Sequence, residues 1–118
     1  MGKPKRFNIT LVNSILHPWR RYIDGKLAYA VNDIPGGTII IKRYQTYQFL
    51  FNSYPVDEQR YAFYLTTDPV GMDDGISPSI SNDTMTIYID EHYPSVFYYQ
   101  DKYHKFIGGI VLVTDCIR

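Results

Sequence analysis

The stretch from Val96 to Val113, read VFYYQDKYHKFIGGIVLV, constrains the fold of this chain more than any other segment. Its first part contains the aromatic run Phe97 to Tyr99, and aromatic residues favour β-strands. Gly108 and Gly109 permit a sharp change of direction, and Ile110 to Val113 is a short apolar run typical of a buried strand. The stretch therefore predicts a hairpin in which two strands flank a polar loop.

The rest of the chain repeats short strand candidates separated by turn residues, and no segment has a helical periodicity. Tyr47, Phe49 and Phe51 alternate with more polar residues, so we expect them to share one face that points inward. The three consecutive isoleucines at 39–41 predict a strand that is buried on both sides or lies near a bend. The further strand candidates are Phe7–Val12, Leu27–Val31, Thr38–Lys42, Arg60–Thr67 and Thr84–Asp90. Together these segments predict an all-β fold, a Greek-key β-sandwich of about seven or eight strands.

Length and charge limit the function classes open to the chain. A length of 118 residues with 45% hydrophobic content suits a single domain over residues 1–118. Twelve basic and twelve acidic residues cancel, so no net field attracts nucleic acid or a membrane. No apolar run is long enough for a membrane span or a signal peptide. We expect an intracellular chain, one packaged in a particle, or a mature fragment whose leader has been removed. Residues 1–6 are expected to form a disordered basic tip.

The polar loop carries a recognisable motif. The chain reads Tyr98-Tyr99-Gln100-Asp101, then His104, then Ile107-Gly108-Gly109. This order resembles the ligand-bearing loop of the cupredoxins, the small blue-copper sandwiches, many of which read YYxC-x-x-H-x-x-M-G-G. The resemblance covers roughly residues 28–115 and implies a cupredoxin-like fold. It also implies that Asp101 replaces the cysteine, that Ile107 replaces the methionine and that Tyr61 replaces the first histidine.

These replacements exclude the chemistry of a blue-copper site. Such a site needs two histidines and a cysteine thiolate in a trigonal arrangement with a weak axial ligand. Asp101 is a hard oxygen donor, Ile107 donates nothing, and Tyr61 is a poor ligand while it is protonated. We therefore predict no metal ligand set and no cofactor. Asp101, His104 and Tyr61 are left as weak candidates for zinc or non-blue copper.

Catalytic arrangements are equally sparse. Asp101 and His104 can form an acid–base pair, but two polar residues three positions apart in a loop are common. His17 precedes a proline and is expected to be satisfied or to face solvent rather than to bind metal. No glycine-rich phosphate loop precedes a helix. We therefore expect a protein that is not an enzyme and has no catalytic residues.

The leading hypothesis is a non-enzymatic, cupredoxin-like domain with a degenerate copper site that acts as a binding or structural component. Its partner is an unknown protein or a second copy of the chain. Twelve tyrosines support binding, because tyrosine offers a large contact area at low entropic cost. Tyr98, Tyr99 and Tyr103 are the candidate binding residues; the alternative is that alternate tyrosines lie in the core and the others line the outer face. Two alternatives stay open: a metal-binding protein that uses His104 and Asp101, and a virion-packaged protein of an AT-rich virus, which composition alone suggests.

Overall fold

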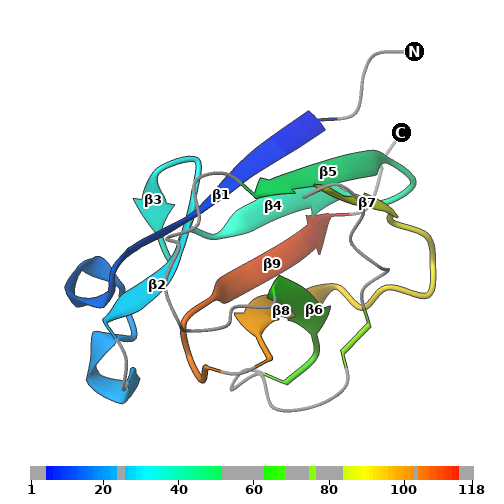
Figure 1. The fold of residues 1–118 in the computed structure, drawn as a ribbon. Coiled ribbons are helices and arrows are strands. Elements are labelled where there is room, and N and C mark those ends of the chain that lie inside the picture. The colour runs from blue at the N-terminus through cyan, green and yellow to red at the C-terminus, as the bar shows by residue number, and fades with distance from the viewer. Residues whose placement is uncertain are drawn as a thin grey trace.

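Two β-sheets form the framework of the molecule in a computed structural model that describes residues 5–23, 26–51, 63–68, 75–76, 84–102 and 104–114 (Figure 1). The first sheet has five strands in the order β3-β2-β1-β5-β7 and the second has four in the order β4-β9-β8-β6. The strands are β1 (Lys5–Asn13), β2 (Leu27–Val31), β3 (Ile34–Pro35), β4 (Ile39–Lys42), β5 (Thr46–Phe51), β6 (Phe63–Thr66), β7 (Thr84–Tyr88), β8 (Val96–Asp101) and β9 (Gly109–Thr114). The predicted all-β sandwich is confirmed.

Both sheets are mixed. β1 pairs in parallel with β5, and β4 pairs in parallel with β9, whereas the other neighbouring strands are antiparallel. The predicted hairpin is β8 and β9, which pair with Tyr99 opposite Gly109. The additional strand relative to the prediction is β3, whose two residues lie within turn-forming sequence and pair with the end of β2.

Aromatic side chains from both sheets fill the space between them. The ring of Phe63 in β6 packs edge-on against Tyr29 in β2 and Phe51 in β5, with centroid distances of 5.2 and 4.9 Å. The same ring stacks on Tyr99 in β8 at 5.8 Å. Each aromatic pair of this kind adds roughly 0.5–1.5 kcal/mol beyond the burial of its area. The predicted inward face of β5, formed by Tyr47, Phe49 and Phe51, is confirmed.

Two details of the sequence interpretation are wrong. Of the two alternatives for the isoleucine run in β4, burial on both sides is wrong: Ile39 and Ile41 are 1% exposed, but Ile40 is 59% exposed. Alternate residues of a strand face opposite sides of the sheet, and the side that Ile40 faces is exposed, since Val96 of the interior strand β8 is 48% exposed on the same side. The basic tip does not extend to residue 6, because Lys5 and Arg6 are the first residues of β1 and pair with β5.

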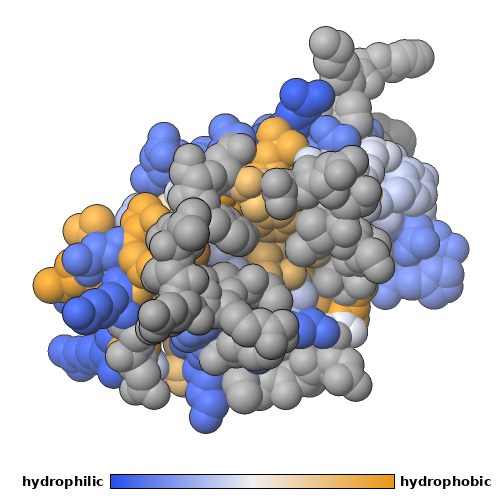
Figure 2. All heavy atoms as spheres, viewed as in Figure 1, coloured by the Kyte–Doolittle hydropathy of each residue, from blue (hydrophilic) through white to orange (hydrophobic). Residues whose placement is uncertain are grey.

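Two single-turn 3-10 helices, η1 (Ser14–Leu16) and η2 (Arg20–Tyr22), connect β1 to β2. They are the blue coils at one end of the molecule in Figure 1. Hydrophobic side chains reach the surface at this end, beside hydrophilic ones (Figure 2). Among the helices that the structure describes, none is long and apolar enough to span a membrane.

Candidate functional site

The predicted site centres on Asp101, the last residue of β8. Phe97, Tyr99 and Asp101 alternate along the strand and therefore all point into the sandwich. The Asp101 side chain is completely buried. The hydroxyl of Tyr29 in β2 donates to Oδ1 at 2.7 Å, and Nδ1 of His104 lies 2.8 Å from Oδ2. A buried carboxylate requires such partners. Asp101 therefore links the first sheet, the end of β8 and the β8–β9 loop.

His104 lies in the β8–β9 loop and completes this group. Its side chain is 24% exposed, so the ring lies between the buried carboxylate and the surface. An ionised carboxylate only accepts hydrogen bonds, so Nδ1 of His104 carries the proton that points at Asp101. A carboxylate in this position fixes both the tautomer and the orientation of the imidazole. The pair that the sequence suggested is thus formed, with Tyr29 as a third member that the sequence did not indicate.

A second histidine holds the same loop from outside the hairpin. His17, which follows η1, is 1% exposed, and its Nε2 lies 2.6 Å from the carbonyl oxygen of Gly108. The backbone N–H of Trp19 donates to Nδ1 at 2.9 Å, so Nε2 carries the proton and donates to Gly108. Burial lowers the pKa of His17, and the bond to Gly108 opposes this shift only in part. The expectation that the His17 ring has hydrogen-bond partners is correct. No local sequence pattern reveals that one of them is Gly108, which lies 91 positions away.

The two glycines of the loop have a steric rather than a conformational role. A Cβ on Gly108 would lie 1.5 Å from the carbonyl oxygen of Tyr99, and a Cβ on Gly109 would lie 2.6 Å from the Tyr99 hydroxyl. The N–H of Gly108 also donates to the buried side chain of Gln100 at 3.0 Å. The glycine pair is therefore needed because the chain passes directly against β8.

The candidate binding tyrosines do not form one patch. Tyr99 is completely buried, its hydroxyl donates to the carbonyl of Gly37 at 2.6 Å, and burial raises its pKa. Proposing Tyr99 as a surface residue was wrong, because neighbouring residues of a strand point to opposite faces. Tyr98 lies on the outer face of the sheet and is half-buried. Tyr103 and the metal candidate Tyr61 lie outside the described residues.

The residues present do not fit a blue-copper ion. The oxygens of Asp101 already accept from Tyr29 and His104, and Ile107, which packs in the core, has no donor atom. Within the described ranges, no group of three or more His, Cys, Asp or Glu side chains is placed to hold a metal ion. The site offers a hard carboxylate, which is hydrogen-bonded to a phenol and an imidazole, and it has no soft thiolate of the kind that blue-copper chemistry requires.

Comparison with known proteins agrees with the sandwich geometry. No model of a known protein family matches the sequence, and neither does any curated protein sequence. The structure resembles that of the copper protein rusticyanin, with a TM-score of 0.62 and 16% identity over 97% of this chain and 80% of rusticyanin. A structure of rusticyanin from Thiobacillus ferrooxidans gives a TM-score of 0.59 and 16% identity over 97% and 79% of the two chains.

A larger protein contains a similar unit. The multicopper oxidase McoA from the hyperthermophile Aquifex aeolicus matches 97% of this chain with a TM-score of 0.50 and 15% identity, and the match covers 27% of McoA. The chain therefore has a cupredoxin-like fold, as the order of its motifs predicted. Structural similarity at identities this low establishes the fold alone, so the function has to be argued from the residues of the site.

Proposed function

We propose that this chain is a non-enzymatic binding or structural component that keeps a cupredoxin-like fold without a blue-copper site. The observation that carries the proposal is the state of Asp101, which is completely buried and accepts hydrogen bonds from Tyr29 and His104. By the resemblance, this is the position of the copper-binding thiolate. A carboxylate bound in this way joins β2 to the β8–β9 loop, which is a structural task.

The outer face of the second sheet supports a binding role. Ile40 in β4, Leu112 in β9 and Val96 in β8 are direct partners in the strand register, and Tyr98 and Ile110 form the next pair on the same face. Ile40 is 59% and Val96 is 48% exposed. Outer faces of sandwich sheets are commonly polar, and apolar exposed strips often mark contacts with other proteins. We call these five residues the outer row.

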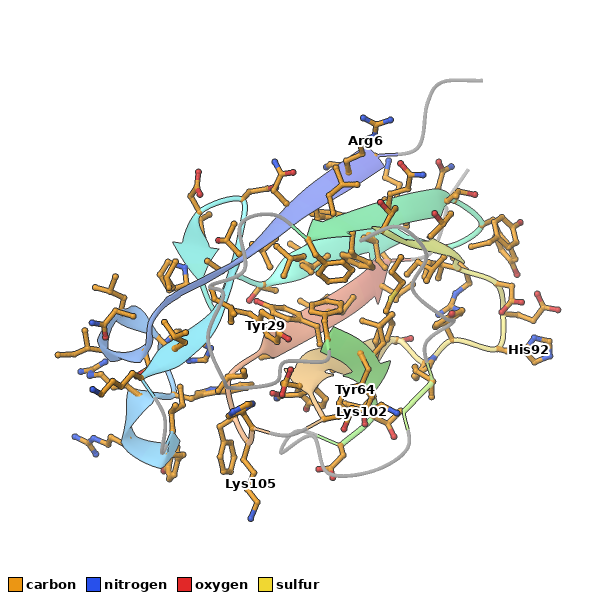
Figure 3. All side chains as sticks on the ribbon, in the orientation of Figure 1. Arg6, Tyr29, Tyr64, His92, Lys102 and Lys105 are labelled. Carbon is orange, nitrogen blue, oxygen red and sulfur yellow. The ribbon has the colours of Figure 1, made fainter. Side chains whose placement is uncertain are left out.

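The first experiment is elemental analysis of untagged protein after exposure to copper(II) or zinc and dialysis. The proposal predicts metal well below one ion per chain and no blue absorption band. His104→Gln is the informative variant, and His92→Gln is the matched control because the His92 side chain is 83% exposed (Figure 3). Stoichiometric metal that is lost in His104→Gln but kept in His92→Gln would overturn the proposal.

One observation favours a second candidate, a non-blue metal site at His104. A histidine that binds a metal almost always donates its other ring N–H to a carboxylate, a carbonyl or a water, and Nδ1 of His104 donates to Asp101. In that case Asp101→Asn should weaken metal uptake by about 10–100-fold, whereas His104→Gln should abolish it. Equal uptake by both variants and the unmodified protein would exclude this candidate.

A further inference from the structure

The connection between β1 and β2 exposes large apolar side chains instead of burying them. Ile15 and Leu16 in η1 are 65% and 63% exposed, and Tyr22 in η2 is 63% exposed. The two helices contact each other, so these side chains belong to one surface at the end of the molecule (Figures 1 and 2). We call Ile15, Leu16, Arg20, Arg21 and Tyr22 the η tip.

Positive charge surrounds the apolar part of the η tip. Arg20 and Arg21 are exposed and immediately precede Tyr22. The carbonyl of Lys26 accepts from the N–H of Ser14 at 2.8 Å, which places a third cation beside η1. The ring of Phe106 lies 5.3 Å from that of Tyr22, which brings the adjacent Lys105 to the same end (Figure 3).

None of these cations is neutralised by a neighbour within the part of the chain that the structure describes. No ion pair there involves Arg20, Arg21, Lys26 or Lys105. From residue 5 to residue 31 the sequence contains a single acidic residue, Asp24. The chain as a whole is neutral, so the positive charge is a local property of this end.

The backbone of the η tip is held in place. The buried ring of His17 bonds to Gly108, and the side chain of Asn13 caps η1 by accepting from the N–H of Ile15 at 2.9 Å. A Cβ on Gly36 would lie only 2.7 Å from Nε2 of His17, which shows how closely the segment is packed underneath. Ile15 and Leu16 therefore stay outside, and a partner that covers them orders little additional chain.

We infer that the η tip is a docking surface for a protein partner that presents an apolar pocket rimmed by carboxylates. The inference rests on the proposed binding role and names the class of partner. Exposed isoleucine, leucine and tyrosine supply apolar area, and Arg20 and Arg21 supply the complementary charge. Arginine and tyrosine are among the residue types that are enriched at the centres of protein interfaces. The apolar side chains lie on two single-turn helices, which do not form the longer amphipathic helix that lies in a membrane interface.

Trp19 provides the signal for the test. It is the only tryptophan in the chain, it immediately precedes η2, and its ring lies 5.6 Å from that of His17. The probe is a synthetic peptide in which glutamates flank a core of leucine and phenylalanine. The comparison probes are the same peptide with lysines in place of glutamates, and vesicles of phosphatidylserine and phosphatidylcholine. Each is titrated into the full chain while Trp19 fluorescence is recorded.

We expect a saturable change with the glutamate peptide that weakens as salt concentration rises. Two variants should each raise the dissociation constant for the glutamate peptide by at least about tenfold: the single variant Leu16→Ser, and the double variant that combines Arg20→Glu and Arg21→Glu. Arg6→Glu is the matched control, because Arg6 is an exposed cation at the opposite end of β1 (Figure 3). Its affinity for the peptide should match that of the unmodified chain.

Three results would overturn the inference: equal response to both peptides, response to vesicles alone, or no response at all. Failure here is separable from failure of the proposed function. Nuclear magnetic resonance of the labelled chain with the same peptide would show which residues respond. Shifts at the outer row, with none at the η tip, would keep a binding role and remove the η tip from it. Only stoichiometric metal at His104 would remove the proposed function itself.

Discussion

Replacing Asp101 with alanine tests whether the buried carboxylate is a structural link between the sheets. The substitution removes the acceptor of the Tyr29 hydroxyl, at 2.7 Å, and the acceptor of His104 Nδ1, at 2.8 Å. A hydrogen bond to a charged group contributes about 1.5–3 kcal/mol. Two such bonds, less some relaxation of the partly exposed His104, predict a loss of about 3–5 kcal/mol in the free energy of unfolding.

The assay is urea unfolding at neutral pH, followed by Trp19 fluorescence. Domains of this size are stable by about 5–15 kcal/mol, so Asp101→Ala can leave too little folded protein to measure. Tyr29→Phe is the milder partner variant, because it removes one bond and keeps the ring that packs on Phe63. We expect it to lose about 1.5–3 kcal/mol.

A double-mutant cycle decides whether the two effects share one interaction. Asp101→Asn replaces the charge-assisted bond from Tyr29 with a neutral one, which is about half as strong, and remains close to the native shape. If Asp101→Asn and Tyr29→Phe interact, their combined loss should differ from the sum of the single losses by about 0.5–3 kcal/mol. Strict additivity, or a loss below about 0.5 kcal/mol for Asp101→Ala, would refute the reasoning, because changes that small are typical of surface sites.

Three further predictions concern the surroundings of the site. Gly108→Ala should abolish folding or lower the urea midpoint sharply, because its Cβ would lie 1.5 Å from a carbonyl oxygen of β8; an unchanged midpoint would contradict the geometry. Burial lowers the pKa of His17 in the folded chain. Below about pH 6.5 the unfolded chain therefore binds more protons than the folded chain, and the free energy of unfolding decreases as the pH is lowered. Urea midpoints between pH 7.5 and 5 should therefore depend less on pH in His17→Gln, whereas His92→Gln should keep the native slope. Ile40→Lys should change the free energy of unfolding by no more than about 0.5 kcal/mol, whereas Ile39→Ala should lose about 2–5 kcal/mol; equal losses in urea unfolding would show that Ile40 is covered.

The sequence was informative where an interaction is local. Period-two alternation correctly assigned the inward face of β5, because neighbouring strand residues face opposite sides. For the tyrosines, the same rule supported the alternative in which alternate residues lie in the core, and the structure places Tyr99 inside and Tyr98 on the outer face. For the isoleucines of β4, the expectation of burial on both sides was wrong, because the run alone does not show that one face of this sheet is exposed.

The long-range contacts of the site carry no local signal. Tyr29 and Asp101 are 72 positions apart, and His17 and Gly108 are 91 positions apart. Such pairs depend on how the sheets stack, which single-sequence periodicity does not determine. The glycine pair shows the same limit, because its position was evident but its reason, the close passage against Tyr99, is visible only in three dimensions.

The final prediction is that Asp101→Cys does not create a blue-copper site. Two imidazoles hold this loop, but each is already engaged: His17 bonds through both ring nitrogens to Gly108 and Trp19, and His104 uses Nδ1. Offering His17 Nδ1 to a metal would break its bond with the N–H of Trp19. A thiol also replaces a strong acceptor for Tyr29 with a weak one. We expect lower stability in urea and no intense visible band with copper(II), whereas a stoichiometric blue complex would show that the loop rearranges around a thiolate alone. The hydrogen bonds of this loop are therefore expected to oppose the creation of a blue-copper site by a single substitution.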